Sequence, residues 1–372
     1  MKLLKILKDH ELDSIKEKIL KDEELDFEDG VAVLKSNNLP LIGALANYAC
    51  KKKVGNYCYF VTNQHINYTN ICENKCKFCA YYREEGENGA FTLSKNEIMK
   101  RALEASKIGV TELHIVGGLN PNLPFEYYED MLKTLREKYP NMSLQAFTAI
   151  EIDYIAKKSG NSIKEVLLRL KEAGLTSLPG GGAEIFNKHI RTRICPNKIS
   201  GDRWLKVMEI AHNLGIPSNA TMLYGHIEKK EDIVHHILKI RDLQKRTNGF
   251  QSFIPLSFHP HNTELLKEGL VHYGSTGFED LKIFAVSRLL LKDYINNIKT
   301  FWVMFGEKLA QVTLFYGSND IDGTVIEEHI THEAGATTPN YLPKQEIIHL
   351  IKNAGKIPVE RTTNYDILRI YE

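Results

Sequence analysis

The sequence lacks the features of a membrane-spanning or disulfide-stabilised protein. No apolar run approaches the roughly 18 residues needed to cross a bilayer. Six cysteines in 372 residues are too few for a disulfide scaffold, and a net charge of +1 gives no support for a nucleic-acid partner. The N-terminus mixes charges with leucines and has no small-residue cleavage site, unlike a signal peptide. We therefore expect a cytoplasmic protein that binds neither nucleic acid nor a membrane.

The sequence also lacks the dinucleotide-binding fingerprint GxGxxG, which disfavours an open nucleotide-binding sheet. From residue 56 onward, short apolar segments alternate with longer amphipathic ones, which predicts βα units around a parallel sheet. Seven strands are clear, and an eighth near residues 323–326 is weak. We therefore predict an α/β fold, a (β/α)₈ TIM-type barrel over residues 56–340. A helical extension over residues 1–55 precedes it, and a C-terminal helix and extension over residues 341–372 pack on it.

The active site of such a barrel is built from the loops at the carboxyl ends of its strands. Capping boxes at Ser94–Glu97 and Thr276–Glu279 predict where two of the helices begin. Polar residues, glycines and cysteines follow most of the predicted strands, so we expect them to meet at one end of the barrel. These strands cover residues 64–69, 112–116, 143–148, 176–178, 219–223, 252–258 and 298–304.

Half of the six cysteines lie within the segment CENKCKFC, as Cys72, Cys76 and Cys79. Their spacing would fit one face of a helix, so three buried core cysteines are one interpretation. A structural zinc site is another, although zinc normally takes four ligands and no second CxxC pair is present. The third is an iron–sulfur cluster. A cubane normally takes four thiolates, so three would leave one iron open to another ligand. The remaining cysteines are expected to be small buried residues.

The spacing Cys-x3-Cys-x2-Cys, with Phe78 before the last cysteine, resembles the signature of the radical S-adenosylmethionine (SAM) superfamily. The resemblance implies that the thiolates hold a [4Fe–4S] cluster whose open iron binds SAM. An electron from a donor such as flavodoxin or ferredoxin then cleaves SAM to a 5′-deoxyadenosyl radical. Gly117 and Gly118 match the family's glycine motif, which approaches the SAM methionine. Glu184 resembles the residue that contacts the SAM ribose, and Arg193 is expected to bind a SAM or substrate carboxylate.

The resemblance covers about residues 55 to 365 and is closest to the futalosine-pathway enzymes of menaquinone biosynthesis. Segments that carry it include HINYTNIC, GGLNPNLPFEYY, SLPGGGAEIF and DGTVIEEHITHEAGA. The motifs ICP at residues 194–196, MLYGH at 222–226 and FHP at 258–260 are more similar to aminofutalosine synthases than to dehypoxanthine futalosine cyclases. A third group of relatives helps to make the deazaflavin chromophore of coenzyme F420.

The synthase resemblance implies a radical SAM transferase with a small anionic substrate. The SAM-derived radical adds to 3-[(1-carboxyvinyl)oxy]benzoate to give 6-amino-6-deoxyfutalosine, so SAM is a consumed co-substrate. His226 and His259 follow predicted strands, and we expect them to act as catalytic proton-transfer groups. The alternatives are the cyclase and, more remotely, a non-catalytic zinc-stabilised barrel. Further cations for the two substrate carboxylates are Arg191, Lys198 and Arg288.

Overall fold

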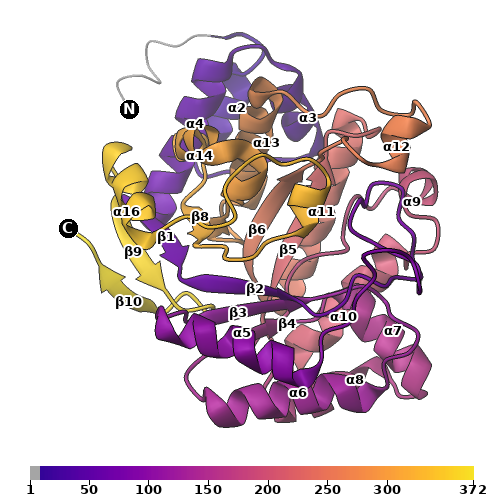
Figure 1. The fold of residues 1–372 in the computed structure, drawn as a ribbon. Coiled ribbons are helices and arrows are strands. Elements are labelled where there is room, and N and C mark those ends of the chain that lie inside the picture. The colour runs from indigo at the N-terminus through magenta and orange to yellow at the C-terminus, as the bar shows by residue number, and fades with distance from the viewer. Residues whose placement is uncertain (1–8) are drawn as a thin grey trace.

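The computed structural model describes residues 9–372, so the part of the predicted helical extension in residues 1–8 lies outside the described residues. Three helices make up the rest of that extension: α2 (Asp13–Leu20), α3 (Phe27–Lys35) and α4 (Leu39–Val54). Helix α3 begins at a capping box, and α4 has a proline in its first turn, where no backbone donor is lost. Helix α3 packs on helices α11 (Lys230–Thr247) and α13 (Gly277–Leu291) of the barrel, α4 packs on α13, and α2 packs on α4 (Figure 1).

The predicted closed barrel is confirmed. Its strand segments are parallel, and isolated bridges join the three hydrogen-bonded sheets through Ser177, Leu178 and Lys299. A bridge between Gln64 and Ile326 closes the ring. The weak eighth strand is present, shifted a few residues towards the N-terminus. The named strands of the barrel are β2 (Asn63–Asn67), β3 (Glu112–Val116), β4 (Ser143–Ala146), β5 (Ser218–Tyr224), β6 (Phe250–Ser257), β7 (Asn297–Ile298) and β8 (Asp320–Gly323).

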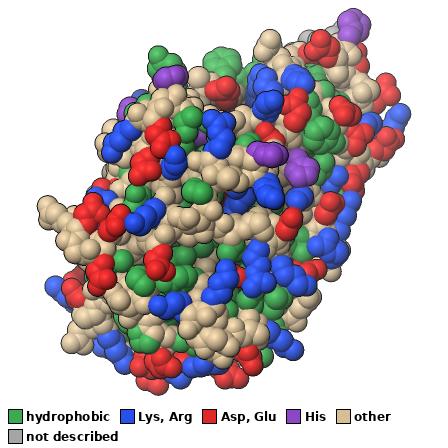
Figure 2. Space-filling view, turned by 90° about the vertical axis from the view of Figure 1, so that its right-hand side faces the viewer, with side chains coloured by type: hydrophobic (Ala, Val, Ile, Leu, Met, Phe, Trp, Pro, Cys, Tyr) green, Lys and Arg blue, Asp and Glu red, His purple; other side chains and the backbone are tan. Residues whose placement is uncertain are grey.

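Helices surround the strands, and both predicted capping boxes are confirmed where α5 and α13 begin. Charged side chains of both signs are interspersed over the face shown in Figure 2, in keeping with the small net charge. Within residues 9–372, no helix is both long enough and apolar enough to span a bilayer. The other helices are α5 (Lys95–Lys107), α6 (Phe125–Lys138), α7 (Ala149–Ser159), α8 (Ile163–Glu172), α9 (Lys188–Ile194), α10 (Gly201–Asn213), α12 (Glu264–Lys267), α14 (Trp302–Thr313) and α15 (Ile330–Glu333).

The predicted strand over residues 298–304 is wrong beyond its first residues. Strand β7 ends at Ile298, and α14 begins at Trp302. The segment is rich in apolar residues that suit a buried strand. In the structure Trp302 and Val303 instead bury one face of a helix, and the Trp302 indole donates to the Gly323 carbonyl oxygen at 2.8 Å. A short apolar run does not distinguish a buried strand from a buried helix turn.

The C-terminal segment is more than the predicted helix and extension. Helix α16 (Lys344–Asn353) is followed by two strands, β9 (Ile357–Arg361) and β10 (Ile367–Ile370). Strand β9 pairs in parallel with β1 (Tyr57–Val61), which itself pairs with β8. Figure 1 shows these last elements beside the first strand of the chain. The C-terminal residues thus cover the amino-terminal ends of the barrel strands.

Candidate active site

A cavity of about 340 Å³ lies inside the barrel and opens at the carboxyl ends of its strands. A site of this size and position is typical of barrel enzymes. Most of the residues that the sequence predicts for the site line this one cavity. They are Cys72, Cys76, Cys79, Phe78, Gly117, Gly118, Glu184 and His259. His226 and Arg193 do not line it.

The cysteine segment forms a loop rather than a helix, which removes the helix-face interpretation. Its backbone is held by the Cys72 N–H, which donates to the Arg83 carbonyl oxygen at 3.2 Å, and by the Lys77 N–H, which donates to that of Ile194 at 2.9 Å. None of the cysteines in residues 9–372 forms a disulfide. Cys50, Cys58 and Cys195 are buried, as expected.

The cysteines that line the cavity suit a cluster better than a single ion. Within residues 9–372, no three His, Cys, Asp or Glu side chains lie close enough to hold one metal ion. A cubane needs no such convergence, because each thiolate binds a different iron. Burial raises the pKa of the Cys76 thiol well above its usual value and also raises that of Cys79. Bound iron would supply the positive charge that holds them as thiolates.

The two glycines after β3 are required by close packing. A Cβ atom on Gly118 would lie 2.2 Å from the Ile71 carbonyl oxygen, and one on Gly117 would lie 2.6 Å from the Tyr68 ring. The Gly117 N–H donates to Glu151 Oε1 at 3.2 Å, and the Tyr68 hydroxyl donates to the same oxygen at 2.6 Å. Only glycine lets the cysteine loop lie this close to the end of β3.

Glu184 forms a buried ion pair with Lys198 at the cavity wall. Lys198 Nζ lies 2.5 Å from Glu184 Oε1 and 4.9 Å from the centre of the Phe78 ring. Burial lowers the pKa of Lys198, but Cys76 and Glu184 outweigh it and raise that pKa above its usual value. Lys198 therefore remains a cation beside the cysteine loop. Of the candidate cations in the sequence, the structure brings this one to the cavity.

The arginines lie elsewhere. Arg193 is exposed on α9. The side chains of this short helix that face inward are those of Ile190, Arg191 and Ile194. Arg191 is buried and donates to the carbonyl oxygens of Ala183 and Ile199, at 2.5 and 2.6 Å. It thereby fixes the glycine-rich loop. Arg288 is buried but does not line the cavity, and it donates to the carbonyl oxygens of Gly317 and Asn296.

The two predicted catalytic histidines have different surroundings. His226 Nδ1 lies 2.9 Å from Glu228 Oε2, and Nε2 lies 3.1 Å from the Leu223 carbonyl oxygen, so its ring holds the loop after β5. His259 lines the cavity, and its Nε2 lies 3.0 Å from the Met304 carbonyl oxygen. That contact assigns the N–H to Nε2 and leaves Nδ1 as an acceptor. Burial lowers the pKa of His259, which favours the neutral ring at pH 7.

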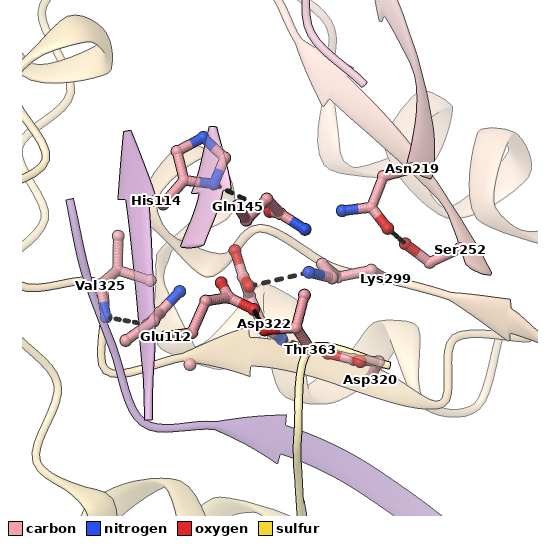
Figure 3. Close-up of polar contacts among 12 residues, drawn as sticks. Glu112, His114, Gln145, Asn219, Ser252, Lys299, Asp320, Asp322, Val325 and Thr363 are labelled. Atoms are coloured by element: carbon pink, nitrogen blue, oxygen red, sulfur yellow. Dashed lines mark hydrogen bonds and ion pairs between the residues drawn. The ribbon is translucent and has the colours of Figure 1, made fainter. Parts of the chain in front are cut away.

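Sequence reasoning missed the polar residues deep in the cavity. His65, His114 and Gln145 are neighbours in register on β2, β3 and β4. Lys299 and Asp322 complete this layer with an ion pair of 3.1 Å (Figure 3). Barrel interiors of this type are normally filled by branched apolar side chains. Polar residues at alternate positions of several strands were therefore the signal that would have identified this layer.

Comparisons with known proteins agree with this geometry. The radical SAM superfamily matches residues 66–240, and the CofH/MqnC C-terminal region matches residues 247–372. Aminodeoxyfutalosine synthase from Thermus thermophilus is 43% identical, over 98% of both chains. The 5-amino-6-(D-ribitylamino)uracil–L-tyrosine 4-hydroxyphenyl transferase of Methanocaldococcus jannaschii is also 43% identical, over 94% of this chain and 98% of the relative.

Solved structures with the same fold include methylornithine synthase, with a TM-score of 0.71 at 17% identity over 92% of this chain and 96% of that one. A maturase of the [FeFe]-hydrogenase has a TM-score of 0.74 at 19% identity, over 97% and 78%. The chain belongs to the radical SAM superfamily. It is a radical SAM enzyme, and it uses a [4Fe–4S] cluster and SAM. Its relatives within that superfamily include an aminodeoxyfutalosine synthase and a tyrosine hydroxyphenyl transferase, each 43% identical to it.

Proposed function

We propose that this enzyme is an aminodeoxyfutalosine synthase. The observation that carries the proposal is the match to the Thermus enzyme over 98% of both chains, which includes the N-terminal helices and the C-terminal strands. The 43% identity to the Streptomyces coelicolor enzyme supports it further. In this reaction the 5′ carbon derived from SAM bonds to the terminal CH₂ of the enol ether. The aryl group then migrates from oxygen to carbon. The carboxyl group is lost with water as bicarbonate and a proton, and the one electron left over would return to the cluster, which leaves a closed-shell ketone.

The cavity residues fall into roles that fit this chemistry. Cys72, Cys76 and Cys79 would hold the cluster, which supplies the electron that cleaves SAM when it is bound. The Gly117–Gly118 turn lets the cysteine loop pack against the end of β3, and its backbone lines the cavity where the SAM methionine would lie. Lys198 places a positive charge there for a carboxylate. These groups fix SAM next to the space that the second substrate must occupy.

Two further residues have narrower roles. Glu184 accepts from Lys198 and offers its other oxygen to a ribose hydroxyl. His259 presents its unprotonated Nδ1 to the cavity, where it would accept a proton from the water that takes up the departing carboxyl group. Arg193 has no role in this proposal, because its side chain is exposed outside the cavity. Apolar side chains such as Leu256 and Phe301 complete the wall and exclude water from the radical.

The second candidate is the tyrosine hydroxyphenyl transfer, favoured by the Methanocaldococcus relative at 43% identity. Both reactions, and that of the cyclase, can be tested side by side on anaerobically reconstituted enzyme with a reductant. One arm receives SAM and the enolpyruvyl benzoate, the second SAM, L-tyrosine and 5-amino-6-(D-ribitylamino)uracil, and the third SAM and dehypoxanthine futalosine. We expect product in the first arm only, with the adenosine-derived carbons retained in it. Turnover in another arm with none in the first would overturn the proposal.

A further inference from the structure

The deepest part of the cavity is a polar floor inside the barrel, formed by His65, His114, Gln145, Asn219, Lys299 and Asp322. It lies well below the cysteine loop. His114 lies on β3 three residues before Gly117, which directly follows that strand. Because a strand rises about 3.3 Å per residue, the floor is about 10 Å deeper than the glycine turn. The mechanism above assigns these residues no role. Yet most are almost completely buried, and polar groups in such a position require partners.

Several donors in the floor have unused hydrogen-bonding capacity. Lys299 Nζ has three N–H bonds, and its ion pair with Asp322 Oδ1 at 3.1 Å uses one. Asn219 accepts from Ser252 Oγ at 2.8 Å through its oxygen, which leaves its amide nitrogen facing the cavity. Figure 3 shows this nitrogen, the Gln145 amide and the Lys299 ammonium pointing towards one another from different sides of the barrel.

One buried nitrogen atom in the floor, on His65, has no hydrogen-bond partner among the described residues. The side chain of His65 is 6% exposed, and within residues 9–372 its Nε2 atom has no hydrogen-bond partner. The ring is held in place by stacking on His114, with 4.5 Å between ring centres, and on Phe301. Burial, together with the neighbouring His114 and Lys299 charges, lowers the pKa of His65 well below its usual value, so it faces the cavity as a neutral ring. A neutral imidazole can place an N–H on this nitrogen.

Donors outnumber acceptors in the floor. The acceptors that remain include the second oxygen of Asp322, whose negative charge is offset by Lys299, and the Nε2 atom of His114, whose Nδ1–H donates to Gln145 Oε1. Amide, ammonium and imidazole N–H groups around one space suit a ligand with several lone pairs and a negative charge, which describes a carboxylate. Above the floor the wall is apolar at Ile254, Leu256 and Phe301, as a flat aromatic ring requires.

We propose that this floor is a carboxylate subsite that binds the ring carboxylate of an aryl carboxylate substrate, with Lys299, Asn219 and His65 as its donors. The identification of the ligand as the benzoate end of the substrate rests on the proposed function. Anchoring that end at the bottom of the barrel places the rest of the molecule towards the glycine turn and the cysteine loop. The floor residues thus act as specificity-determining groups and position the reacting double bond.

The test compares two substrates in two enzymes. One substrate is the enolpyruvyl benzoate, and the other is 2-phenoxyacrylate, which has the same enol ether without the ring carboxylate. The variant is Lys299→Gln combined with Asp322→Asn, which removes both charges and leaves neither partner buried alone. We expect kcat/KM for the benzoate to fall about 100-fold in the variant, and that for 2-phenoxyacrylate to change less than 3-fold. Equal losses for both substrates would overturn the subsite.

Two further variants test a single floor residue and control for general effects on stability. His65→Phe preserves the stacked ring and removes its nitrogen, and we expect it to lower kcat/KM for the benzoate about 10-fold while sparing 2-phenoxyacrylate. Lys344→Gln is the matched control, because Lys344 forms its ion pair with Glu360 at 2.6 Å outside the cavity. It should leave both values unchanged. Loss of the benzoate preference in this control would assign the effect to general stability instead.

A binding measurement separates the subsite from the proposed reaction. Calorimetry on the reconstituted enzyme with SAM compares 3-hydroxybenzoate with phenol. We expect 3-hydroxybenzoate to bind at least tenfold more tightly than phenol, and the Lys299→Gln/Asp322→Asn variant to lose that difference. This result would support the subsite even if the wild-type enzyme made no aminodeoxyfutalosine. Equal affinity for the two ligands would overturn the subsite even if the enzyme did make it.

Discussion

Two polar layers lie one above the other inside the same barrel, and they differ in whether their side chains face the cavity or one another. In the lower layer, Asp320 Oδ2 accepts from Arg361 Nε at 2.8 Å and from the Tyr365 hydroxyl at 2.7 Å. Glu112 Oε2 accepts from Thr363 Oγ1 at 2.7 Å, as Figure 3 shows. In the upper layer, the cavity floor, Lys299 uses one of its three donors, and His65 Nε2 has no hydrogen-bond partner within residues 9–372.

This difference indicates that, on the same set of strands, the lower layer stabilises the fold and the upper layer is available to a ligand. A buried polar group that has its partners stabilises the fold, and one that lacks a partner is available to a ligand. The lower layer is closed by the C-terminal segment, and its residues Glu112, Asp320, Arg361 and Thr363 do not line the cavity of the candidate active site. The upper layer faces the cavity that also contains the cysteine loop. The four predictions below test this contrast, from the largest effect to the smallest.

The first prediction concerns the cysteine loop above the floor. Cys76→Ala should abolish SAM cleavage, because two thiolates cannot hold the cluster with one iron reserved for SAM. Release of methionine from SAM, measured anaerobically with a reductant, checks the loss, and iron–sulfur absorbance checks its cause. Cys195→Ala is the matched control. It is a buried cysteine outside the motif and should keep both signals. SAM cleavage that survived in Cys76→Ala would refute the cluster assignment.

The second prediction concerns the lower layer. Arg361→Met leaves the Asp320 carboxylate buried without its guanidinium partner, so we expect the free energy of unfolding to fall by about 3–5 kcal/mol. Urea denaturation of the reconstituted enzyme measures it. Arg369→Met, at an exposed position of β10, is the control and should change the free energy by less than about 0.5 kcal/mol. A loss in Arg361→Met no larger than in the control would contradict a structural role for this layer.

The third prediction uses pH to separate the layers. Burial lowers the pKa of both His65 and His114, which belong to the upper layer, whereas the lower-layer contacts described above include no histidine. Protons then bind the unfolded state more readily, so stability falls as pH drops through the ordinary histidine range. One histidine that stays neutral when folded accounts for about 2 kcal/mol of loss between pH 7 and pH 5.

His65→Phe should therefore reduce the acid-induced loss by up to that amount, measured as the difference in unfolding free energy between pH 7 and pH 5. Thr363→Val, in the lower layer, should lower stability by about 1 kcal/mol equally at both pH values. An acid-induced loss as large in His65→Phe as in the wild-type enzyme would show that this ring is not held neutral by the fold.

The smallest effect is expected at the surface. Arg193→Gln should change kcat/KM for the enolpyruvyl benzoate by less than 2-fold, because the side chain is exposed and lines no part of the cavity. Lys198→Gln is the informative partner, since Lys198 contacts Glu184 and the Phe78 ring beside the cysteine loop. We expect it to raise the KM for SAM at least tenfold. A large effect of Arg193→Gln would mean that α9 moves into the cavity on substrate binding.

Local signals in the sequence predicted the parts of the fold that depend on local interactions. Capping boxes and hydrophobic periodicity identified where most helices and strands lie, and the cysteine spacing identified the loop that lines the cavity. Strands β9 and β10 were missed because β9 is specified by pairing with β1, about 300 residues away in the chain. A local sequence pattern does not indicate which distant strand will pair with it.

The site shows the same division. His226 and His259 occupy equivalent positions after predicted strands, yet a carboxylate two residues along the chain, Glu228, holds the His226 ring in the loop. Lys299 was overlooked because it lies in a segment that resembled an ordinary buried strand. Its place in the site depends on the ion pair with Asp322 and on the cavity that it lines together with Asn219, both of which exist only once the strands have closed.

The pairing of β9 with β1 also has a consequence for biosynthesis. The ribosome releases β9 about 300 residues after β1, and Arg361 and Thr363 must arrive before the lower layer has its partners. Contacts of such long sequence separation form late and slowly. A polypeptide that terminates shortly before residue 357 would therefore contain every cysteine of the loop and every residue of the cavity floor. It would leave Asp320 without Arg361 and Tyr365, and Glu112 without Thr363. Residues 357–365 are thus required to complete the lower layer beneath the cavity.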